Sequence, residues 1–73
     1  MIFLNVPAQQ DKIIKLLNNY DQDGLTFDFV DKKGLKLRFK TNATDLDAAA
    51  KTAKAAVKAE VWGSMLSFQA GFE

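Results

Sequence analysis

The chain has 73 residues, a net charge of +1, and a composition that is 48% hydrophobic and 26% charged. This length excludes two domains, so we expect a single domain over residues 1–73. The composition is that of a folded, soluble protein rather than a disordered or polybasic one. The absence of Cys and His excludes disulfides, thiolate zinc sites and catalytic triads with a His base.

The N-terminal third of the chain predicts a strand, a helix and a turn. Residues 2–6 alternate with the period of two that is typical of a strand. Residues 7–20 have apolar side chains at helical spacing. They begin with Pro7, which suits the first turn of a helix. Residues 21–24 read Asp-Gln-Asp-Gly, which is turn chemistry that ends the helix. The positions expected to face the core are Ile2, Leu4, Val6, Ile13, Leu17 and Tyr20.

The middle of the chain predicts two half-buried strands joined by a hairpin. Residues 25–30 and 35–40 each alternate apolar and polar side chains, with Leu35 in the apolar set. Their apolar sets face each other if a three-residue loop, Lys32-Lys33-Gly34, connects them, with Gly34 at the position that needs a positive φ. The predicted pairs are Phe29 with Leu37, Phe27 with Phe39, Val30 with Lys36, Asp28 with Arg38, and Thr26 with Lys40.

The last third of the chain predicts a second helix and a final strand. Thr44 is the expected N-cap of the helix, with Asp47 in its first turn. Residues 64–72 then alternate as a strand. The helix has a core stripe of Leu46, Ala49, Ala50, Ala53 and Val57. One flank of this stripe carries Lys51, Lys54 and Lys58. The other flank has small residues that we expect to pack closely against the first helix, and it consists of Ala48, Thr52, Ala55 and Ala59.

The order of predicted elements is β-α-β-β-α-β. Two right-handed crossovers around a central hairpin give a ferredoxin-like split β-α-β sandwich of the α+β class. We therefore expect a four-stranded antiparallel sheet in the order 4-1-3-2, with both helices on one face. The other face of the sheet would be left uncovered.

The open face and the last strand predict a noncatalytic protein-interaction module. A chain of this size buries a small core, which favours a homodimer or a protein partner. Residues 64–72 contain no Pro, Lys or Arg, although edge strands normally carry such residues to prevent pairing with another chain. The residues predicted for this interaction are Phe3, Val30, Met65, Ser67 and Gln69.

Two other functions remain open from the sequence. Phe3 on the open face, beside Lys36, Arg38 and Lys40, is similar to the arrangement of RNA recognition motifs. This resemblance implies a weak binder of single-stranded nucleic acid that uses these four residues. The other alternative is a small regulatory ligand-binding domain.

The sequence argues against an enzyme, a metal site or a bound cofactor. The only close carboxylate pairs, Asp21 with Asp23 and Asp45 with Asp47, have structural roles in a turn and in a helix first turn. No segment has the length of apolar residues that a membrane span needs, and the N-terminus lacks the basic region of a signal peptide. We expect a cytoplasmic protein with no membrane association.

Overall fold

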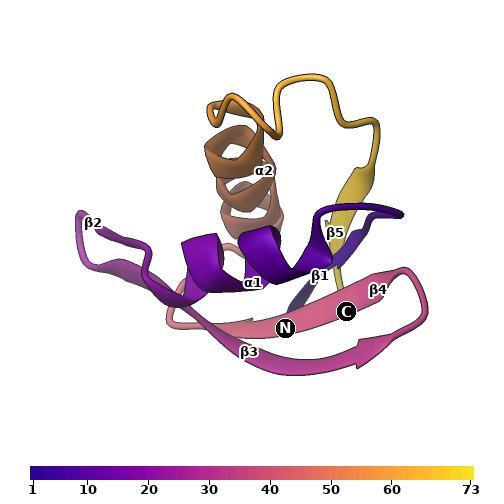
Figure 1. Ribbon diagram of the computed structural model, residues 1–73. Helices are drawn as coiled ribbons and strands as arrows, with labels where there is room; N and C mark the ends of the chain where they lie inside the picture. The colour runs from indigo at the N-terminus through magenta and orange to yellow at the C-terminus, as the bar shows by residue number, and fades with distance from the viewer.

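The computed structural model describes residues 1–73 and shows two α-helices packed on a curled antiparallel sheet (Figure 1). The expected α+β class is confirmed. Neither helix has the length and apolar character needed to cross a membrane. In chain order the elements are β1 (Ile2–Asn5), α1 (Gln10–Asn18), β2 (Asp21–Gln22), β3 (Leu25–Lys33), β4 (Lys36–Thr41), α2 (Leu46–Lys58) and β5 (Gln69–Phe72).

The sheet has five strands rather than the predicted four. Their order is β2-β3-β4-β1-β5, and every neighbouring pair is antiparallel. The additional strand, β2, has two residues and pairs with the start of β3. The loop between them is Asp23-Gly24, and both residues have positive φ (54° and 80°), as a type I′ turn requires. The Asp-Gly pair, expected only as a turn that ends the helix, therefore also closes a hairpin.

One face of the sheet and both helices share a single hydrophobic core. The strands contribute alternate residues, and each helix contributes its apolar stripe, as the two periodicities predicted. Since both helices pack on the same face, the other face of the sheet carries no helix. The core consists of Ile2, Leu4, Val6, Ile13, Leu17, Phe27, Leu37, Phe39, Ala49, Ala50, Ala53, Val57 and Phe68.

The pairing of β3 with β4 differs from the predicted register. Val30 is the extra residue of a β-bulge, which shifts the register by one between Phe29 and Asp31. The loop shortens to Gly34 and Leu35, so Leu35 is exposed rather than directed inward. Gly34 has a positive φ of 58°, as expected. The observed pairs are Phe27 with Thr41, Asp28 with Lys40, Phe29 with Phe39, Asp31 with Arg38, Lys32 with Leu37, and Lys33 with Lys36.

Both helices begin later than predicted. Gln9 has a left-handed backbone (φ 61°), which interrupts the helical path after Pro7, so α1 begins at Gln10. The N-cap of α2 is Asp45 rather than Thr44. The Asp45 carboxylate accepts a hydrogen bond from the N–H of Ala48 at 3.0 Å. Because Asp caps a helix as well as Thr does, the two neighbouring residues could not be distinguished from residue type alone.

The small-residue flank of α2 is not covered by α1. Three of its four residues, Ala48, Ala55 and Ala59, are exposed. The helices instead leave a hollow of about 370 Å³ between them, lined on the side of α1 by Leu16 and Tyr20. The prediction of close helix–helix packing is therefore wrong, because each helix packs mainly against the sheet.

The last strand is shorter than predicted, since β5 covers Gln69–Phe72 rather than residues 64–72. The residues before it form turns and a loop at the end of α2. The ammonium of Lys58 donates to the carbonyls of Ser64 (3.3 Å) and Leu66. The backbone N–H groups of Ser64 and Leu66 also close turns by donating to the carbonyls of Glu60 and Gly63, so this segment does not continue the strand.

Candidate interaction surfaces

The face of the sheet without helices carries a chain of charged side chains. Arg38 donates two hydrogen bonds to the carboxylate of Asp31 (2.7 and 2.5 Å) and a third to the carboxylate of Glu73 (2.9 Å). The other carboxylate oxygen of Glu73 accepts from the ammonium of Lys36 at 2.9 Å. This ammonium lies 4.6 Å from the centre of the Phe3 ring. The four charged residues and the ring form the outer-face network.

The outer-face network lowers the pKa of both carboxyl groups. Hydrogen bonds from Arg38 are the main reason that the pKa of Asp31 lies below its ordinary value. The pKa of Glu73 is lowered first by its hydrogen bond from Lys36 and then by the one from Arg38. The same bonds raise the pKa of Arg38. Asp28, the predicted partner of Arg38, lies elsewhere because the bulge brings Asp31 opposite the guanidinium.

The lowered pKa values predict that the protein loses stability in acid. Asp31 and Glu73 titrate at lower pH in the folded chain than in the unfolded chain, where carboxyls have a pKa of about 4. Their contribution is therefore complete above that pH and is lost as the pH falls through the folded pKa values. We expect the urea midpoint of unfolding to fall between about pH 6 and about pH 2.

An Arg38→Met variant should show a smaller loss of stability in acid than the wild type, because both carboxyls lose a hydrogen-bond donor. A Lys40→Met variant removes a cation that forms none of the ion pairs in the structure and should behave as the wild type. Equal acid sensitivity in Arg38→Met and in the wild type would contradict the conclusion that Arg38 lowers the pKa of Asp31 and Glu73.

The residues predicted for nucleic-acid binding lie along β1 and β4. Phe3, Lys36 and Arg38 belong to the outer-face network, and Lys40 lies further along β4. The network balances its two cations with two carboxylates. The ring of Phe3 contacts Lys36 and also lies over Gly71, where a Cβ would stand 2.8 Å from the ring. The network is therefore electrically balanced, and a phosphate would have to displace its carboxylates.

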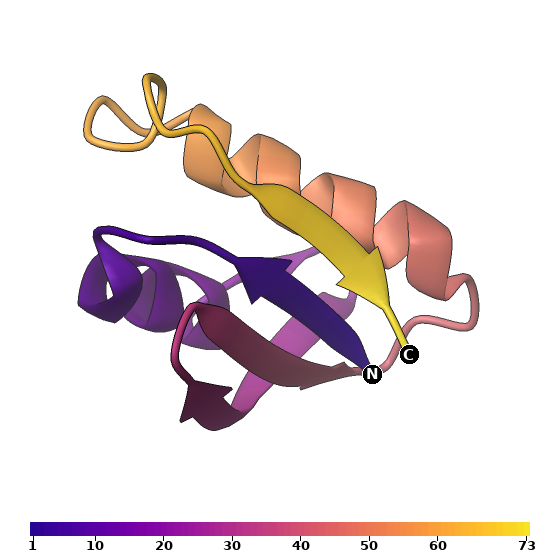
Figure 2. The same ribbon diagram turned by 90° about the vertical axis from the view of Figure 1, so that its right-hand side faces the viewer.

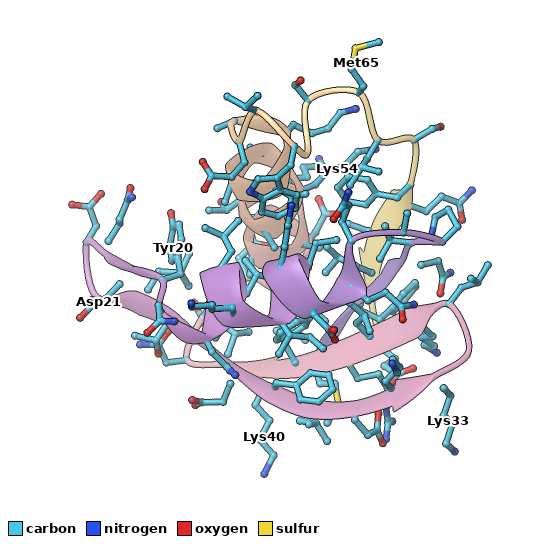
Figure 3. All side chains as sticks on the ribbon, viewed as in Figure 1. Tyr20, Asp21, Lys33, Lys40, Lys54 and Met65 are labelled. Atoms are coloured by element: carbon cyan, nitrogen blue, oxygen red, sulfur yellow. The ribbon has the colours of Figure 1, made fainter.

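The five residues predicted for self-association fall in separate places. Phe3 and Gln69 lie on the outer face of the neighbouring strands β1 and β5. Val30 is the bulged residue of β3, two strands away from β1. Ser67 lies in the loop before β5. Met65 is 92% exposed in a turn, and Figure 3 shows it at the end of the molecule far from β3 and β4. The structure thus brings together only Phe3 and Gln69.

β5 forms one edge of the sheet, with β1 on one side and no strand on the other (Figure 2). The N–H of Glu73 donates to the carbonyl of Met1 at 2.9 Å, which identifies a hydrogen-bonded pair of the β1–β5 ladder. Because bonded and non-bonded pairs alternate in an antiparallel ladder, Ala70 and Phe72 direct their N–H and C=O groups away from β1. The Phe72 side chain beside them is 51% exposed.

The other exposed edge, along β3, is protected against pairing. β2 covers only its first two residues. Beyond them, the side chain of Asn18 accepts a hydrogen bond from the N–H of Phe29 at 2.8 Å. The bulge at Val30 and the charged residues 31–33 follow. These are the devices by which proteins keep an edge strand from pairing, and β5 contains neither a bulge nor Lys, Arg or Pro.

A cavity of about 550 Å³ lies between α1, β2 and the segment that follows α2. Its apolar wall is formed by Leu16, Tyr20 and Trp62. Sequence reasoning missed this cavity, because two segments that are distant in the chain, residues 12–22 and residues 60–62, form it. The one signal in the sequence was the single Trp, placed just after a helix. Charged side chains also line the cavity, from Lys12, Lys15, Asp21 and Glu60.

No group of three or more Asp and Glu side chains lies close enough to hold a metal ion. Comparisons with protein-family models, with curated proteins and with solved structures found no match to this chain.

Proposed function

We propose that this protein is a small noncatalytic interaction module that forms a homodimer through the free edge of β5. The strand order β3-β4-β1-β5 of the four longer strands, with both helices contributing to one core, also supports a ferredoxin-like arrangement. In this arrangement β5 is the edge strand at which a second copy can add.

The observation that carries the proposal is the difference between the two edges of the sheet. The edge of β3 is interrupted by a bulge, charged residues and the hydrogen bond from Phe29 to Asn18. The edge of β5 has none of these features, and its outward N–H and C=O groups have no strand beside them. Pairing with a second β5 would satisfy these groups by main-chain hydrogen bonds.

The surroundings of β5 indicate where two copies would meet. Lys54 and Lys58 of α2 lie over the ring of Phe68, with their ammonium groups 5.6 and 5.9 Å from its centre. Two copies of this basic end would repel each other, so we place the two-fold axis near Gly71. Antiparallel pairing about this axis sets Ala70 of one copy opposite Phe72 of the other, and it covers the exposed Phe72 ring.

The proposal is tested by light scattering of the protein from low-micromolar to near-millimolar concentration. The wild type should approach twice its chain mass of 8.1 kDa as the concentration rises. Ala70→Pro should remain a monomer, because Pro removes an N–H from the free edge and none from the β1–β5 ladder. Phe72→Lys should also remain a monomer, because it places a charge on the edge.

Leu35→Lys is the matched control for Phe72→Lys. The two side chains have similar exposure, 56% for Leu35 and 51% for Phe72, but Leu35 lies in the β3–β4 loop. This variant should associate as the wild type does. Circular dichroism of each variant establishes that the monomer is folded. A wild type that is monomeric at every concentration, or folded Ala70→Pro and Phe72→Lys variants that still dimerise, would disprove association through β5.

A further inference from the structure

The cavity between α1, β2 and the segment after α2 is separate from the β5 edge, so its use does not depend on the proposed dimer. Figure 3 shows Tyr20 at the junction of α1 and β2, on the side of the molecule away from β5. The volume of about 550 Å³ lies in the range of small-molecule sites. A hollow of about 370 Å³ adjoins it, and the two share Leu16, Tyr20, Gln22 and Glu60.

The apolar wall of the cavity is held in place by the core. Leu16, Tyr20 and Trp62 are each half-buried and pack against core residues. The ring of Tyr20 meets the ring of Phe27 edge-on at 5.4 Å between centres. Two aromatic side chains in fixed positions can receive a flat apolar group by stacking or edge contacts.

The charged groups of the cavity form no ion pairs within the protein. Lys12 and Lys15 lie one turn apart on α1, and Glu60 lies across from them after α2. None of these groups takes part in an ion pair of the structure. The ammonium of Lys12 lies 5.8 Å from the centre of the Trp62 ring. The cavity therefore offers free charges of both signs beside an aromatic wall.

We propose that this cavity binds a zwitterionic small molecule with a flat apolar body, of the class of aromatic α-amino acids. Its carboxylate would lie by Lys12 and Lys15, its ammonium group by Glu60, and its ring against Trp62. A simple anion would be repelled by Glu60 and Asp21, and a simple cation by the two lysines. An α-amino acid carries both charges on one carbon, so its carboxylate and its ammonium group would each meet an opposite charge of the cavity while its ring lies against the apolar wall.

The protein contains a single Trp, Trp62, so its fluorescence reports directly on this cavity. Three probes of similar shape differ in charge: L-phenylalanine carries both charges, phenylpropionate only the carboxylate, and phenethylamine only the ammonium. L-phenylalanine should change the emission of Trp62 in a saturable way. It should bind about tenfold more tightly than either of the others. Calorimetric titration with the same probes measures binding if the emission does not change.

Two variants test the role of each charge. Glu60→Gln should weaken binding of L-phenylalanine and strengthen binding of phenylpropionate, because it removes a negative charge. Lys12→Met should weaken binding of L-phenylalanine and strengthen binding of phenethylamine. Lys40→Met, a change of the same kind on the distant strand β4, should leave all three affinities unchanged.

Three outcomes would overturn the proposal. The first is no binding of L-phenylalanine by fluorescence or by calorimetry. The second is equal affinity for all three probes, which would show that charge is not recognised. The third is unchanged affinities in both Glu60→Gln and Lys12→Met, which would place any binding elsewhere. None of these outcomes bears on dimerisation through β5.

Discussion

A Gly63→Ala variant is expected to lose about 3 kcal/mol of unfolding free energy. Gly63 is buried in the turn after α2, and a Cβ there would stand 2.1 Å from the carbonyl oxygen of Val57. This oxygen belongs to the helix backbone and accepts the N–H of Glu60, so it cannot move without disrupting the end of α2. A chain of this size has a total stability of about 4 to 11 kcal/mol, so the variant would lose between about a quarter and about three quarters of it.

Gly24→Ala is the matched control for Gly63→Ala. Gly24 has a φ of +80° and open space around it, so its added methyl group meets no atom and costs only backbone strain, about 1 to 2 kcal/mol. Urea unfolding followed by circular dichroism measures both variants. If Gly63→Ala proves no less stable than Gly24→Ala, the close contact between the turn and the end of α2 is wrong.

A Phe39→Ala variant is expected to lose about 3 to 5 kcal/mol. Phe39 is fully buried in the centre of β4 and lies opposite Ile2 on one side and Phe29 on the other. Its ring meets that of Phe29 edge-on at 5.6 Å between centres. Truncation would leave a cavity among the side chains of three strands, which relax only partly because each is held by its ladder.

Val61→Ala is the control variant for Phe39→Ala, because it also truncates an apolar side chain, but one that is 94% exposed. That change should stay within about 0.5 kcal/mol of the wild type, as surface substitutions usually do. Thermal or urea unfolding, with the slope against denaturant checked for each variant, gives the difference. A loss below about 1 kcal/mol for Phe39→Ala would mean that the strand is not packed in the core as described.

The free edge of β5 and the cavity differ in how far the sequence could predict them. The lack of Lys, Arg and Pro near the C-terminus indicated an unprotected edge, and β5 does form an edge of the sheet. Residue type could not show that Lys58 holds the preceding loop, so Met65 and Ser67 were expected on a strand that does not extend to them. The cavity is formed where residues 60–62 meet residues 12–22, and nothing in the local pattern of either segment indicates that they meet.

The amino-acid sequence was enough to predict the α+β class, the approximate position of each principal element and the faces that form the core. These features follow from side-chain periods of two and of 3.6, which act within a few residues of chain. The three-dimensional structure was needed to find the bulge at Val30, the Arg38–Asp31 and Arg38–Glu73 contacts, the length of β5 and the cavity beside Trp62. Each of these features depends on contacts between groups that are distant in the chain. The free energy of the whole fold decides which of these contacts form, and the residue types of a single segment do not show it.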